Sequence, residues 1–162
     1  IMIFTDKPFK VGDRIKINGF DGSITEIGIR TSRMRTLEGR LVTIPNSLFT
    51  GDMVENVTEE PSRKVVLNLG LTYSMKAEQI EKGIEVLKEI AANNNDLEEN
   101  VSLGFNAFGD FSLGIIFIYY IKKDSDILGT QTAINLEILK QFGTHGLEMA
   151  FPTQTIYNIK ED

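Results

Sequence analysis

The fold is decided by the stretch Thr36-Leu37-Glu38-Gly39-Arg40-Leu41-Val42-Thr43-Ile44-Pro45-Asn46-Ser47. Residues 37–39 are predicted to form a hairpin loop, because glycine readily adopts the backbone angles that a tight turn requires. Residues 40–44 return as a strand, which Pro45 ends because proline has no amide hydrogen to donate to a strand ladder. With residues 31–36 as its first strand, the stretch predicts an antiparallel hairpin.

Further short strands are predicted on the N-terminal side of this hairpin. Residues Val11 to Asn18 alternate between apolar and polar, and Gly19 to Gly22 is predicted to be the turn that follows them. Over residues 23–29 the alternation changes parity, which predicts a long strand with a bulge or sharp bend near Gly28. Short bent strands at this spacing are typical of a small β-barrel.

The pattern changes after Glu59-Glu60-Pro61-Ser62, a charged, proline-bearing segment that we take as the domain boundary. Beyond it, strands are predicted at residues 63–73, 101–107 and 111–121, helices at about 75–92 and from Ser125 to Gly143 or Gly146, and two short strands around Pro152. The order of elements is β-α-β-β-α-β, the split βαβ pattern of ferredoxin-like domains. Residues 111–121 are apolar on both faces, so we expect that strand to be central and covered.

Composition excludes several classes of function. The 17 basic and 23 acidic residues give a net charge of −6, which opposes binding to nucleic acid phosphates. With no cysteine and one histidine, thiolate metal sites and most acid–base constellations are unavailable to the chain. We therefore expect no enzyme, no metal and no cofactor. The longest apolar run, residues 113–121, is shorter than the roughly 20 residues of a membrane-spanning helix.

Arginines form one dense basic cluster in the first half, at positions 30, 33, 35 and 40. Residues 10–40 hold seven basic and four acidic side chains, a local excess of three positive charges. Such a cluster can be a solvated surface, or it can face anionic lipid headgroups, a neighbouring subunit or permeating anions. The sequence alone leaves these alternatives open.

An RNA-binding module is the alternative function, because small bent barrels and ferredoxin-like sheets both bind RNA. Residues Gly114 to Tyr120 weakly resemble an RNP1 strand, which needs a leading basic residue and two aromatic residues on an open face. Here Leu113 precedes the glycine, and Ile115, Phe117 and Tyr119 share one face. A covered sheet explains this pattern better than an RNA platform does.

Four blocks of sequence, in order, resemble the β domain of the MscS-type small-conductance mechanosensitive channels. They are residues 7–15 (KPFKVGDRI), 22–30 (GSITEIGIR), 36–47 (TLEGRLVTIPNS) and 55–58 (ENVT). The positions that match the family's motifs are Pro8, Phe9, Gly12, Asp13, Gly22, Gly39, Pro45 and Asn46. The second half matches the family in pattern only, through its element order and the closing Phe151-Pro152.

The resemblance implies a mixed β and α+β fold with defined boundaries. A small Sm-like bent β-barrel would span residues 6–60, a ferredoxin-like domain residues 61–151, and a C-terminal strand residues 152–162. Composition alone favours a loose terminus at residues 1–4, whereas the resemblance implies that residues 1–5 are the stub of a pore-lining helix. Pro8 would break that helix as it leaves the membrane.

The resemblance also implies a function and partners. Copies of the chain would form a homo-oligomeric ring, a heptamer in that family, with sheet edges in residues 11–57 paired between neighbours. This ring would be the cytoplasmic vestibule of an inner-membrane channel, supporting the pore and filtering ions and solutes through side portals during osmotic stress. Membrane contact would occur through helices that this chain lacks, and no nucleic acid would bind. Lys7 and Lys10 would lie beneath the lipid headgroups, and Arg63 and Lys64 are candidates for the portal lining.

Overall fold

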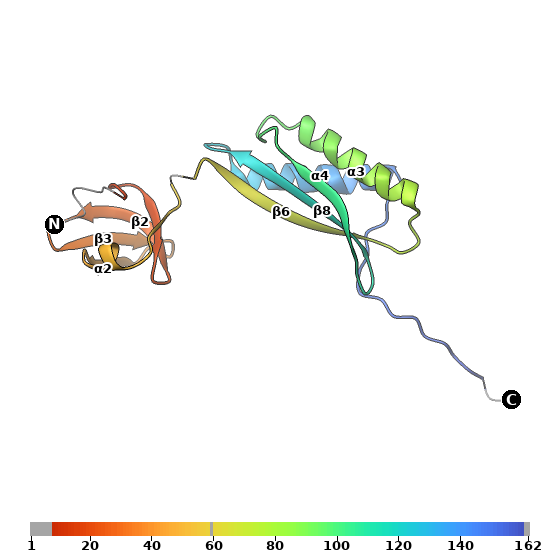
Figure 1. Ribbon diagram of the computed structural model, residues 1–162, viewed down its shortest axis with the longest axis horizontal. Helices are drawn as coiled ribbons and strands as arrows, with labels where there is room; N and C mark the ends of the chain where they lie inside the picture. The colour runs from red at the N-terminus through yellow and green to blue at the C-terminus, as the bar shows by residue number, and fades with distance from the viewer. Residues whose placement is uncertain (1–7, 59, 161–162) are drawn as a thin grey trace. The chain divides into compact units, whose positions relative to one another are not determined.

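The computed structural model describes residues 8–58 and 60–160, and the chain divides into two compact units between Glu60 and Pro61 (Figure 1). The expectations for residues 1–5 and for Lys7 lie outside the described residues. Among the described residues, no helix has both the length and the apolar character needed to cross a membrane.

The first unit, here called the β unit, is a five-stranded antiparallel sheet with strand order β4-β3-β2-β1-β5. Its elements are β1 (Arg14–Ile17), β2 (Phe20–Ile27), β3 (Thr31–Thr36), β4 (Leu41–Pro45), the short helix α2 (Leu48–Gly51) and β5 (Glu55–Asn56). Alternate side chains of β1 and β3 are buried, as a half-buried strand requires. They form a core with members from every strand except β5, together with Phe9 and Phe49.

The predicted hairpin is confirmed, with β3 and β4 joined by residues 37–40, so the return strand begins at Leu41 and not at Arg40. The predicted turn over residues 19–22 is wrong. The turn is Asn18-Gly19, whose φ angles are both positive, as a two-residue hairpin turn favours. Gly22 is instead a buried residue of β2. The expected bend near Gly28 is present at residues 29–30, between β2 and β3, whereas the bulge lies further back, where the register shifts between Ile24 and Glu26.

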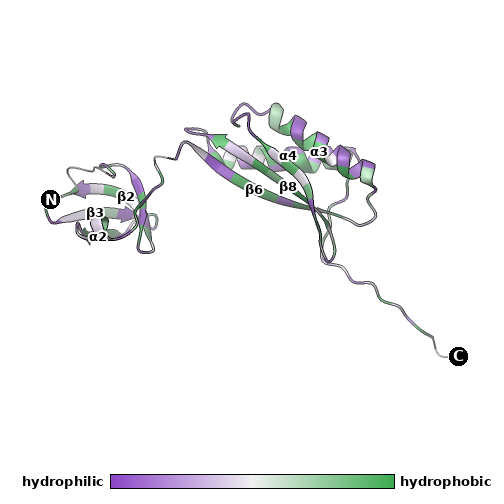
Figure 2. Ribbon diagram, viewed as in Figure 1, coloured by the Kyte–Doolittle hydropathy of each residue, from purple (hydrophilic) through white to green (hydrophobic). Residues whose placement is uncertain are grey.

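The second unit, here called the α/β unit, has a three-stranded antiparallel sheet with strand order β6-β8-β7. Its elements are β6 (Ser62–Leu71), α3 (Ala77–Ala92), β7 (Ser102–Phe108), β8 (Leu113–Lys122) and α4 (Ile127–Thr144). Polar and apolar bands alternate along α3, which packs its apolar side into the core (Figure 2). The predicted element order is confirmed from β6 to α4, and so is the central position of β8.

The expectation that β8 is covered is correct for one face only. Alternate residues from Leu113 to Ile121 are buried among side chains of α3 and α4. On the opposite face, Ile116, Ile118 and Tyr120 are only half-buried. Both helices of the α/β unit pack on the same side of the sheet, so the helix-free side keeps its apolar residues near the surface.

The expected C-terminal strand over residues 152–162 is not formed by the described residues 151–160. One bridge, between Leu71 and Met149, stands where the fourth strand of the split βαβ pattern would lie. A strand needs a hydrogen-bonded partner, and the described part of this chain offers none to residues 151–160. Four large apolar side chains of this tail are exposed: Phe151, Ile156, Tyr157 and Ile159.

Candidate functional site

A buried carboxylate fastens the beginning of the β unit. Asp13 is 2% exposed, and its Oδ2 atom accepts hydrogen bonds from the backbone N–H of Lys10 (3.1 Å) and from Nδ2 of Asn56 (3.0 Å). The turn from Lys10 to Asp13 is possible because Gly12 adopts φ +96°, a conformation that favours glycine. A charged acceptor strengthens both bonds, so Asp13 ties two segments that are distant in sequence.

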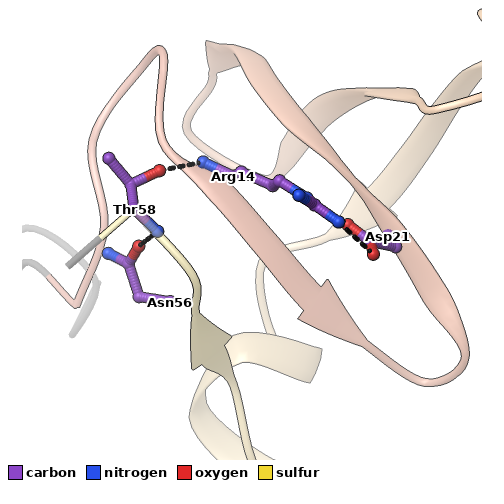
Figure 3. Close-up of polar contacts among 4 residues, drawn as sticks. All are labelled: Arg14, Asp21, Asn56 and Thr58. Carbon is purple, nitrogen blue, oxygen red and sulfur yellow. Dashed lines mark hydrogen bonds and ion pairs between the residues drawn. The ribbon is translucent and has the colours of Figure 1, made fainter. Parts of the chain in front are cut away.

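The second segment runs from Asn56 to Thr58, at the end of the β unit. Asn56 Oδ1 accepts the N–H of Thr58 (3.1 Å), and Thr58 Oγ1 accepts the N–H of Arg14 (2.6 Å), as Figure 3 shows. Asn56 Nδ2 also donates to the backbone oxygen of Pro8 (3.3 Å). We call Lys10, Asp13, Arg14, Asn56 and Thr58 the Asp13 latch. It joins the leading segment of the unit, residues 8–14, to its trailing segment, residues 56–58.

Arg14 also pairs with Asp21 across β1 and β2. Its Nε and Nη2 atoms each lie 2.9 Å from one carboxylate oxygen, a bidentate arrangement (Figure 3). The hydrogen bond from Arg14 holds the pKa of Asp21 below its ordinary value, and the same bond raises the pKa of Arg14. The pair thereby orients the start of β1, where the backbone N–H of Arg14 donates to Thr58.

Because the pKa of Asp21 is lowered in the folded state, the Arg14–Asp21 pair stabilises the β unit above about pH 4. This contribution should disappear as the pH falls through the folded pKa. Both side chains are partly exposed, so we expect less than about 1 kcal/mol, decreasing with added salt. Urea unfolding of wild type and Asp21→Asn at pH 7 and pH 2 measures it. A difference that persists at pH 2 would contradict the assignment.

A second polar cluster lies around Asn46, just after β4. Asn46 is buried; its Nδ2 donates to the backbone oxygen of Gly28 (2.8 Å), and its Oδ1 accepts from the buried hydroxyl of Ser32 (2.7 Å). The backbone N–H of Asn46 donates to the oxygen of Arg30 (2.9 Å). These bonds fix the turn between β2 and β3 against the end of β4, where Pro45 pairs with Thr31.

The remaining motif residues have packing or turn roles in the β unit. Phe9 is buried, and its ring centroid lies 4.6 Å from that of Phe49. Gly39 has φ +86° in the hairpin loop. At Gly22 an added Cβ would overlap the backbone oxygen of Arg35 and lie 2.8 Å from Cγ of Met34. Pro8 is exposed at the start of the described chain.

The basic candidates among the described residues belong to both units. Lys10 is exposed in the β unit, whereas the candidates for the portal lining lie at the start of β6. Successive side chains of a strand point to opposite faces. Arg63 is therefore half-buried on the face that packs against the helices, and Lys64 is exposed on the other face, opposite Tyr120.

The site residues that the sequence analysis did not select are Arg14, Asp21, Ser32, Asn56 and Thr58. A signal for two of them exists in the Asn-x-Thr pattern of residues 56–58, since asparagine commonly caps the amide two residues later. The partnership between Asp13 and Asn56 spans 43 positions, so local sequence does not indicate it. Within the described residues, no three acidic or histidine side chains converge as metal ligands would.

Comparisons with known proteins place both units in one class. Residues 1–59 match the family model described as "Mechanosensitive ion channel, beta-domain", and residues 65–149 match "Mechanosensitive ion channel MscS, C-terminal". The two units thus define the β and C-terminal domains of a mechanosensitive ion channel, a class of membrane channels and not of enzymes. The chain belongs to the MscS family. This region of MscS-family channels lies on the cytoplasmic side of the inner membrane.

Relatives at the level of sequence cover all or nearly all of the chain. It is 38% identical over 164 residues to the small-conductance mechanosensitive channel MscMJ of Methanocaldococcus jannaschii, covering 100% of this chain and 47% of that protein. It is 32% identical over 163 residues to the low conductance mechanosensitive channel YnaI of Escherichia coli, covering 97% of this chain and 47% of that protein. The chain therefore spans about half the length of these curated relatives.

A solved structure agrees on the fold. The closed state of Helicobacter pylori MscS matches with a TM-score of 0.84 at 20% identity, covering 99% of this chain and 63% of that chain. The predicted fold class, mixed β and α+β, is confirmed. The observation offered for RNA binding is not supported, because the aromatic rings of Phe117 and Tyr119 are buried in the core.

Proposed function

We propose that this chain is the vestibule region of a mechanosensitive channel, and that it supports the pore and filters solutes during osmotic stress. The observation that carries the proposal is the Asp13 latch. It connects the leading segment, which in a channel would continue from the pore helix, to the trailing segment, which continues into the α/β unit.

The latch suits a mechanical role because both chain ends of the β unit are held at one place. A force that arrives along the leading segment reaches Asn56 and Thr58 through two side-chain hydrogen bonds and a backbone bond from Val57 to Arg14 (2.9 Å). The force need not cross the sheet. The α/β unit can therefore support the pore, or be displaced by it, while the β-unit core stays packed.

Channels of this family are homo-oligomers, and we propose a ring of about seven copies for this chain. The open strand edges support the proposal. Among the described residues of the single chain, β4 and β5 lie at the two edges of the β-unit sheet, and each has a strand partner on one side only. Pairing β4 of one copy with β5 of the next would satisfy these edges and close a ring.

The filtering role rests on side portals lined by Arg63 and Lys64. Two cationic side chains in each subunit, repeated around a ring, would raise the local concentration of anions at the openings. Size would exclude large solutes, and lining charge would set the preference among small ions.

Replacing Arg63 and Lys64 together by glutamate should lower the anion-to-cation permeability ratio by about twofold or more. The measurement is single-channel recording of the full-length channel that contains this region, under a salt gradient. The matched control replaces both residues by glutamine, which removes the charge without inverting it and should give an intermediate ratio. An unchanged ratio in both variants would show that these residues do not line the conducting path.

A further inference from the structure

One face of the α/β-unit sheet has an apolar centre that its own unit leaves open. Val66 is 48% exposed, and Ile116, Ile118 and Tyr120 are half-buried. The register places Val66 directly opposite Ile118, so these side chains form one continuous surface. None of the four belongs to the core formed with α3 and α4. We call these four residues the open sheet face.

The sequence of β8 is that of a strand covered on both sides. Central strands buried on both faces are nearly continuous apolar runs, whereas strands with one face in water alternate with polar residues. Residues 113–121 contain no charged side chain, although the α/β unit covers only alternate positions. The composition of β8 thus indicates a second covering layer that this unit does not supply.

A complementary apolar surface lies on α4. Leu128, Leu136 and Leu139 are 73%, 61% and 66% exposed. They are spaced by eight and eleven positions, which brings them to one side of a helix. The core-facing side of α4 is formed by other residues, among them Ile134 and Ile138. We call the three exposed leucines the α4 leucine stripe.

We propose that the α/β units of neighbouring copies pack head to tail, with the open sheet face of one copy on the α4 leucine stripe of the next. If two copies packed through the same surface, open sheet face on open sheet face or stripe on stripe, each copy would bury only one of its two apolar surfaces. A head-to-tail contact buries both, and it repeats until the ring closes. The inference deepens the proposed function and rests on it, because it names the surfaces by which the ring assembles.

Charge supports contact between the sheet side of one copy and the helix side of the next. On the open side of the sheet, the three described strands carry Lys64 and Lys122 and no acidic residue, a net charge of +2, whereas Arg63 lies on the side that faces the helices. α3 carries four glutamates and two lysines, a net charge of −2, and α4 carries one of each. Opposite net charges favour this orientation, and two sheet sides facing each other would repel.

Cross-linking tests the contact directly, because the chain has no cysteine of its own. The double variant Ile118→Cys, Leu136→Cys of the 162-residue chain is treated with a short bis-maleimide. We expect a ladder of covalent dimers, trimers and larger species, because each copy offers both halves of the contact. Each single variant alone should give at least tenfold less dimer, and an equal mixture of the two should stop at dimers. The control pair is Leu136→Cys with Thr25→Cys on the β unit, which should give no ladder.

Native mass spectrometry of the unmodified chain tests the proposed ring separately from the proposed head-to-tail contact. A ring together with a ladder supports both. A ring without a ladder overturns the head-to-tail contact and leaves the proposed assembly in place. Efficient dimers from Ile118→Cys alone overturn the contact in favour of like-with-like packing. A monomer at all concentrations overturns the ring for this chain, and the contact with it.

Discussion

Replacing Gly22 by alanine is expected to destabilise the β unit by about 3 kcal/mol. Gly22 lies in the middle strands of the sheet, paired with Ile15 on one side and Thr36 on the other. An added Cβ would overlap the backbone oxygen of Arg35, and a backbone atom in a ladder cannot move away as the end of a side chain can. Relief would require β2 and β3 to separate.

The matched control for this substitution is Gly51→Ala in α2. No atom lies within 4 Å of an added Cβ there, and the backbone has no positive φ. We expect a change within about 0.5 kcal/mol, in the stabilising direction because alanine loses less backbone entropy. The free energy of unfolding is measured in urea, with amide hydrogen exchange as the probe. Because the two units can unfold separately, exchange at individual amides shows which unit each substitution destabilises. Equal effects at both glycines would contradict the close approach of β2 and β3.

Replacing Asp13 by alanine should destabilise the β unit by about 2–3 kcal/mol. The substitution leaves the N–H of Lys10 and the amide of Asn56 without their shared acceptor at a site that water barely reaches. Asp13→Asn should recover only part of the loss, because its amide oxygen can accept both bonds but is uncharged, and bonds to a charged acceptor are stronger. The control is Asp52→Ala, which removes one exposed bond from Asn18 and should cost less than about 0.5 kcal/mol.

Hydrogen exchange can show whether the Asp13 latch acts as a connection between segments. In Asp13→Ala, the amide of Thr58 should lose protection together with that of Lys10, although the two lie far apart in sequence. In Asp52→Ala both should keep it. If exchange rises at Lys10 alone, Asp13 is a local turn residue and the mechanical argument for the latch fails.

The elements that the sequence predicts well are those with a local cause. The loop between β3 and β4 depends on one glycine, Gly39, and the helix from Ala77 to Ala92 depends on the spacing of its own apolar residues. Gly19 and Gly22 look alike in sequence. Gly19 allows the positive φ of a turn, whereas Gly22 leaves room for the backbone of Arg35 in the neighbouring strand β3. The sequence does not distinguish these two roles, because the second depends on how the strands pack.

The polar contacts of the β unit and the surroundings of β8 lie beyond such local reasoning. Asp13 finds Asn56, and Asn46 finds Gly28 and Ser32, only after the sheet has formed. The apolar pattern of β8 predicts a cover on both faces, but a pattern does not state which chain provides it. One of the two covers belongs to the α/β unit, and the other remains a prediction about a neighbouring copy.

The division of the chain after Glu60 has a consequence for its synthesis. Every contact described for the β unit joins residues between Pro8 and Glu60, so all of these contacts can form before the second half of the chain has been made. The ribosome releases the trailing segment last among these residues. The β unit can therefore fold, and the Asp13 latch can form, once Thr58 has left the exit tunnel, while the α/β unit is still being translated.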